Sequence, residues 1–169
     1  MRLQATEVLK ATALAGVLCL AGLPAAAQSD TFDRTLQVSG LVHLQLSNGS
    51  GNIEVRGSAD GKVHIVGHVS GGWSMMGSKE KNIQEVVANP PIEQHGDTIR
   101  IGKSSNYGKN VSIDYQIEVP KDTDLDVSVA SGGVTADQIR GPVKVSSASG
   151  YAHVYRVEKD VQITTASGD

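Results

Sequence analysis

The last part of the chain repeats one short phrase at a fixed interval. Ala-Ser-Gly occurs three times, with its serine at Ser131, Ser149 and Ser167, so the step is 18 residues both times. Apolar residues stand two positions apart before each serine, as Val143 and Val145 do before Ser149. A period near twenty residues is typical of architectures in which each repeat stacks on the one before it. The alternation predicts a strand, a turn and a second strand in every repeat.

Eighteen residues are enough for one complete coil of chain. Two strands of about five or six residues and two turns bring the chain back above its starting point, roughly 4.8 Å along the stack. Val143 is then expected to stack between Leu125 and Val161. The pattern predicts an all-β, single-chain β-solenoid, similar to a β-helix, with 18-residue coils. A glycine follows each turn serine and suits a backbone of positive φ; these turn glycines are Gly51, Gly132, Gly150 and Gly168.

An earlier coil precedes an interruption of the repeat. Leu44 and Leu46 lie before Ser50 at the same offsets, so residues 42–59 are predicted to form this coil. The interval from Ser50 to Ser131 is not a whole number of repeats. A glycine-rich loop and a short helix that Ser78 could cap are predicted around residues 71–89, ended by two prolines.

One strand beyond the repeats is especially clear. Between Val111 and Val119, apolar residues alternate with polar ones, and Pro120 ends the run. Strict alternation is typical of a strand with one buried face. We therefore expect residues 111–119 to form a strand that leads into the regular repeats.

Residues 1–27 predict a secretory signal peptide. A basic start is followed by the apolar run Thr12–Leu23, which is too short to span a bilayer, and by Ala25–Ala27 as a cleavage site. An uncleaved anchor is the alternative. Cys19 is the single cysteine and lies within this segment. Residues 28–169 are thus predicted to be one exported domain, in the periplasm or at the cell surface, without disulfides.

Composition excludes one class of partner. The formal net charge is −3, aromatic residues make up 4% of the chain, and the sequence shows no basic stripe. Nucleic-acid binding usually requires such a stripe. We therefore expect no nucleic-acid partner.

Four sequence elements, in this order, resemble the bacterial "putative adhesin" family of β-strand-repeat domains of unknown function. They are Asn-Gly-Ser-Gly-Asn-Ile-Glu-Val at 48–55, Tyr-Gln-Ile-Glu-Val-Pro at 115–120, the Ser-Gly-Gly-Val repeat, and the closing Thr-Ala-Ser-Gly-Asp at 165–169. The resemblance implies a β-solenoid in the bacterial envelope and brings no catalytic residue with it. Such domains continue for more coils, so we expect the domain to be truncated at its C-terminus.

The titratable residues do not suggest an enzyme. His64 and His68 are four apart, which on a strand means about 13 Å, too far for one metal ion. Asp124 and Asp126 are about 6.6 Å apart on a strand, a separation that glycoside hydrolysis could use, although a solvated acidic edge is the commoner case. We predict no catalytic, metal or cofactor-binding residue, and no cofactor.

One outward feature is regular. Three residues before each turn serine stands a small hydroxyl residue, which makes a possible ligand-facing ladder of Ser47, Ser128, Ser146 and Thr164. The sequence favours a non-enzymatic, exported binding or structural module of the cell envelope. Its partner could be an envelope glycan, another protein, or a second copy paired through the open C-terminal coil. A polysaccharide-active β-helix enzyme and an end-to-end self-assembling scaffold are the alternatives.

Overall fold

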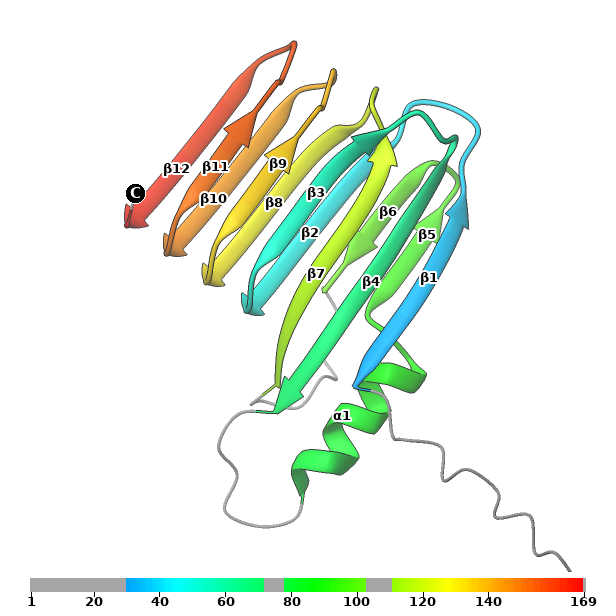
Figure 1. Ribbon diagram of the computed structural model, residues 1–169, viewed down its shortest axis with the longest axis vertical. Helices are drawn as coiled ribbons and strands as arrows, with labels where there is room; N and C mark the ends of the chain where they lie inside the picture. The colour runs from blue at the N-terminus through cyan, green and yellow to red at the C-terminus, as the bar shows by residue number, and fades with distance from the viewer. Residues whose placement is uncertain (1–29, 72–77, 103–110, 169) are drawn as a thin grey trace, which may run out of the picture.

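The computed structural model describes residues 30–71, 78–102 and 111–168, which form two facing six-stranded sheets and one helix (Figure 1). The predicted signal peptide lies outside the described residues. The first sheet contains, in spatial order, β1 (Thr31–Gln37), β4 (Lys62–Gly71), β7 (Val111–Pro120), β3 (Ile53–Ser58), β9 (Val134–Asp137) and β11 (Ala152–Tyr155). The second contains β12 (Val161–Ser167), β10 (Val143–Ser149), β8 (Asp124–Ser131), β2 (His43–Ser50), β6 (Thr98–Ile101) and β5 (Ile92–His95).

Apolar side chains from both sheets meet in one core. The alternation along β7 is as expected, because Ile113, Tyr115, Ile117 and Val119 are buried while the polar residues between them are exposed. In the second sheet, Leu44 is likewise 0% exposed. Each such side chain contributes roughly 1.5–3 kcal/mol on complete burial. The period-two pattern therefore fixes which face of each strand turns inward.

The prediction of an all-β chain is confirmed, but the prediction of a single-chain β-solenoid is wrong. A solenoid stacks its coils in chain order and in parallel, whereas both sheets here are mixed and their strands are out of chain order. β4 pairs antiparallel with both β1 and β7, and β5 pairs antiparallel with β6. The short turn at Gly96, where φ is 61°, explains the last pair, because a tight turn returns the chain antiparallel beside itself.

The repeat governs one part of this arrangement. Leu125 lies opposite Val143, and Val143 opposite Val161, so β8, β10 and β12 follow each other in parallel, each one repeat after the last. Ser50 lies opposite Ser131, which places the earlier coil directly beside the first regular repeat despite the long segment between them. That intervening chain supplies antiparallel strands of the first sheet and the β5–β6 hairpin of the second.

The predicted helix is present as α1 (Ser78–Ala88). It contacts β4 and β1, and it buries Val86 (2% exposed) and Ile83 (9% exposed) in the core. Figure 1 shows it across the end of the sheets where β1 begins. Among the described residues, no helix is long and apolar enough to cross a membrane.

Candidate functional site

The register of the second sheet brings the four predicted ladder residues side by side. Ser47 lies opposite Ser128, Ser128 opposite Ser146, and Ser146 opposite Thr164. They come from four adjacent strands, β2, β8, β10 and β12. Because neighbouring strands are about 4.8 Å apart, the row is roughly 14 Å long. We call these four residues the hydroxyl ladder.

A groove follows the hydroxyl ladder across the strands. Its volume is about 670 Å³, and its lining includes the ladder and a second exposed row two positions further along each strand. Gly102 and the residues between the two rows complete the lining: Asn48, Val129, Ser147 and Thr165. This second row contains only small residues, Gly49, Ala130, Ala148 and Ala166. The small side chains leave room above the sheet, so the groove is shallow, continuous and open to solvent.

The described residues that line this groove carry no charge, while Arg100 and Asp126 line a neighbouring pocket with Ser47 and Ser128. Hydroxyl groups both donate and accept hydrogen bonds and carry no charge. Among the described residues that line the groove, none is titratable. A serine acting as a nucleophile needs a general base within hydrogen-bond reach. The hydroxyl groups of the groove can therefore exchange hydrogen bonds with polar groups of a ligand.

Ser147 is next to the ladder on β10 but belongs to the interior. It occupies the position of buried Val129 in the neighbouring strand and is 4% exposed. Within the described residues its Oγ finds no hydrogen-bond partner. Ser146 faces the groove and Ser147 is buried because adjacent residues of a strand point to opposite faces of the sheet. The spacing used to predict the ladder makes the same distinction.

The turn glycines form a row at the end of the same strands. Their φ angles are 114°, 131°, 137° and 136° in chain order, in the region that favours glycine. A Cβ on Gly150 would overlap the carbonyl group of Gly132 in the preceding repeat. These glycines thus allow successive turns to stack closely at one end of the groove.

The histidines and aspartates considered in the sequence are dispersed among separate partners. His64 Nε2 lies 2.8 Å from Asp33 Oδ1, and His68 Nδ1 lies 2.9 Å from Thr31 Oγ1. Asp124 Oδ2 lies 3.2 Å from His43 Nδ1. In the described part of the chain, no three His, Cys, Asp or Glu residues gather closely enough to hold a metal ion.

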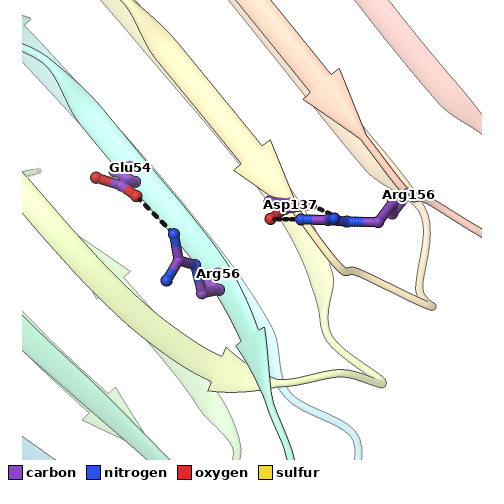
Figure 2. Close-up of polar contacts among 4 residues, drawn as sticks. All are labelled: Glu54, Arg56, Asp137 and Arg156. Atoms are coloured by element: carbon purple, nitrogen blue, oxygen red, sulfur yellow. Dashed lines mark hydrogen bonds and ion pairs between the residues drawn. The ribbon is translucent and has the colours of Figure 1, made fainter.

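A second polar surface lies on the outer face of the first sheet and was missed in the sequence. Figure 2 shows its four charged residues: Glu54 and Arg56 on β3, Asp137 at the end of β9, and Arg156 just after β11. Arg156 donates two hydrogen bonds to the Asp137 carboxylate, one from Nε at 2.7 Å and one from Nη2. Arg56 Nη2 donates to Glu54 Oε1 at 3.4 Å.

The bidentate pair changes the pKa values of both Asp137 and Arg156. The hydrogen bonds from Arg156 hold the pKa of the Asp137 carboxyl below its usual value, against the opposing effect of burial. The same bonds raise the pKa of Arg156. Arg156 reaches this geometry with φ of 50°, and Gln138, one repeat earlier, has φ of 59°. The sequence does contain a signal for this pair, because Asp137 and Arg156 are separated by one repeat plus one position.

Comparisons with known proteins give two distant likenesses. No protein-family model matches the sequence, and neither does any curated protein. A solved structure described as a "putative cell adhesion protein" from Clostridium sporogenes is 12% identical, with a TM-score of 0.45 over 82% of this chain and 99% of that one. A "putative adhesin" from Bacteroides fragilis is 14% identical, with a TM-score of 0.27 over 82% of this chain and 97% of that one.

Proposed function

We propose that this chain is an exported, non-enzymatic module of the bacterial cell envelope that binds an extended polymer. One observation carries the proposal: the hydroxyl ladder lies in register along a continuous groove that contains no titratable side chain among the described residues. A row of neutral donors and acceptors with regular spacing matches a polymer with repeating polar groups better than it matches a small molecule. The bacterial assignment and the export come from the sequence elements described above.

The proposal implies low affinity at each position and a contribution from many positions. Ser47, Ser128 and Thr164 are exposed, so each hydroxyl must give up water to bind a ligand. The net value of such an exchange is only about 0.5–1.5 kcal/mol per hydrogen bond. Binding is therefore expected to grow with polymer length, which distinguishes this module from an enzyme with a closed pocket.

Cosedimentation of the purified exported protein with insoluble peptidoglycan sacculi tests this function. The double variant Ser128→Leu/Ser146→Leu fills the middle of the groove and is expected to weaken binding at least tenfold. Ser70→Leu makes the same change at an exposed position of β4, outside the groove, and is the matched control. Circular dichroism must show that both proteins remain folded.

The proposed function fails in two ways. Absence of wild-type protein from the sacculi pellet rejects peptidoglycan as the polymer, and unchanged binding of the double variant rejects the groove. N-terminal sequencing of periplasmic material checks the export step, for which a start near Gln28 is expected. Recovery of the protein with Met1 in the cytoplasm contradicts it.

A further inference from the structure

Exposed aromatic side chains gather in one place on the outer face of the first sheet. The chain has few aromatic residues: one Phe, one Trp and four Tyr. Phe32 and Tyr115 face each other in the core, with ring centroids 6.2 Å apart. The tryptophan and one tyrosine lie outside the described residues. The other two, Tyr151 and Tyr155, are 43% and 52% exposed and share one face of the β11 segment.

The repeat itself does not require aromatic residues at these positions. One repeat earlier, Gly133, Thr135 and Asp137 take the places of Tyr151, His153 and Tyr155. On β3, the next strand in the sheet, the corresponding residues are Asn52, Glu54 and Arg56. Polar or small residues therefore suffice for a solvent-facing strand, and the aromatic row is an addition to the repeat.

The three rings are held in fixed relation to one another. Tyr151 and His153 lie edge to face, with centroids 4.9 Å apart and planes at 85°. His153 and Tyr155 are 6.0 Å apart, and the Tyr155 hydroxyl lies 2.9 Å from His153 Nδ1. Tyr151 also covers Gly133, where a Cβ would collide with its ring. Ordering these rings before binding lowers the entropic cost of contact with a ligand.

The polar surroundings of the aromatic row are balanced in charge. Glu54, Arg56, Asp137 and Arg156 include two acids and two bases and form two ion pairs (Figure 2). Further across the same face, Glu54 and Arg56 help to line a shallow pocket of about 240 Å³ with His64, Gln116 and Glu118. The exposed carboxylate of Glu118 adds negative charge on this side. An anionic polymer would therefore gain little from this surface, whereas a neutral one would meet no charge repulsion.

From this arrangement we infer that the outer face of the first sheet, centred on Tyr151, His153 and Tyr155, binds a neutral polysaccharide. Sugar rings present C–H groups on one face and hydroxyls at their rim. The negative face of a tyrosine ring attracts such C–H groups, while Gln116 and the paired carboxylates and guanidiniums accept and donate hydrogen bonds at the rim. The inference rests on the proposed function as a polymer-binding module, and it assigns the chemical class of the polymer and a surface separate from the hydroxyl ladder.

The register also fits an extended ligand. Tyr155 is in the row of Asp137, Arg56, Glu118 and His64, which crosses five adjacent strands from β11 to β4. With about 4.8 Å between strands, this row is roughly 19 Å long. A chain of several sugar residues can therefore contact the aromatic row and the shallow pocket together.

Affinity electrophoresis of the exported protein tests the inference. Native gels contain dextran or laminarin as neutral polysaccharides, or alginate as an anionic one. We expect retardation in at least one neutral gel and none in alginate. Tyr155→Ala and Tyr151→Ala are each expected to weaken this retardation at least fivefold, whereas Tyr155→Phe keeps the ring and most of the binding. Leu41→Ala removes an equally exposed apolar side chain (53%) outside the aromatic row and is the matched control.

The outcomes separate this inference from the proposed function. The inference is overturned if wild-type protein is retarded only by alginate, or if neither neutral gel retards it. It is also overturned if Tyr155→Ala and wild type are retarded equally. If sacculi binding persists and is lost only in Ser128→Leu/Ser146→Leu, the polymer-binding function stands and the aromatic surface does not. If Tyr155→Ala instead changes the sedimentation coefficient of the unliganded protein, the row is a contact between copies. Tyr151→Ala could disturb folding by uncovering Gly133, so Tyr155→Ala decides the result.

Discussion

The two ends of the paired sheets, as far as the described residues extend, are built from the same kind of strand but differ in how well their apolar side chains are covered. At one end, β1 and β4 run antiparallel, and α1 adds Ile83 and Val86 to the core, so that Phe32 and Ile65 are 2% and 0% exposed. At the other end, β12 leaves Ile163 44% exposed. Ile163 is in register with Val145, which lies one strand inward and is 0% exposed. Burial in the repeating part thus depends on a neighbour on each side.

The edge strands at the two ends, β1 and β12, also differ in their charged residues. β1 carries Asp33 and Arg34, and charges on an edge discourage pairing with further strands. β12, with the sequence Val-Gln-Ile-Thr-Thr-Ala-Ser, carries none. The comparison shows that the repeat supplies a pattern of pairing, while irregular chain, in the form of antiparallel strands and a helix, closes the core.

The largest expected effect compares the same substitution at the two ends. Ile65→Ala removes buried methyl and methylene groups from the closed end and is expected to cost about 2–5 kcal/mol of unfolding free energy. Ile163→Ala removes the same groups where they are 44% exposed, so its cost is expected to remain below about 1 kcal/mol. Urea denaturation measures both. Equal losses contradict the difference in burial between the two ends.

A smaller effect is expected within the repeat, at its glycine turns. Gly150→Ala forces a side chain to adopt φ of 137° against the carbonyl of Gly132, at a cost on the order of 1–3 kcal/mol. Gly49→Ala is the control, since nothing lies within 4 Å of a Cβ there and the corresponding residues of later repeats are Ala130, Ala148 and Ala166. It is expected to change stability by less than about 0.5 kcal/mol. Similar melting temperatures for Gly150→Ala and Gly49→Ala would contradict the claim that the positive φ of Gly150 makes a side chain costly there.

The smallest effect concerns the ion pair that joins successive repeats. Because Arg156 lowers the pKa of Asp137 in the folded state, the pair stabilises the protein above the usual Asp value of 3.8, and this contribution is lost as the pH falls through the folded pKa. Arg156→Gln is therefore expected to flatten the acid-side decline in urea midpoint between about pH 5 and pH 2.

A matched variant sharpens this test. Arg56→Gln breaks the neighbouring Arg56–Glu54 pair but leaves the hydrogen bonds from Arg156 to Asp137 in place. Its pH profile is expected to remain closer to that of the wild type, because Arg56 lowers the pKa of Asp137 only through its charge. Identical profiles for the two variants would show that Arg156 has no special role.

Local features were predictable because their causes are local. The alternation along residues 111–119 marks a strand with one buried face, and Ser78 through Ala88 form the predicted helix before two prolines. The regular step between repeats also placed Ser128, Ser146 and Thr164 of the hydroxyl ladder in a single row. The aromatic row was equally visible, since Tyr151, His153 and Tyr155 alternate in the sequence, but only the structure shows that Phe32 and Tyr115 lie in the core instead.

Sequence by itself determined the strands, their buried faces, the helix and the step between the regular repeats, because side-chain alternation and backbone preference act over a few residues. The tertiary structure alone decided that β4 lies antiparallel between β1 and β7, and that Ser50 pairs with Ser131 across the interruption of the repeat. Strand order and direction depend on contacts between distant segments, and a period read in one part of the chain does not constrain them. For the same reason, Arg156 could be joined to Asp137 only after β9 and β11 had been placed side by side.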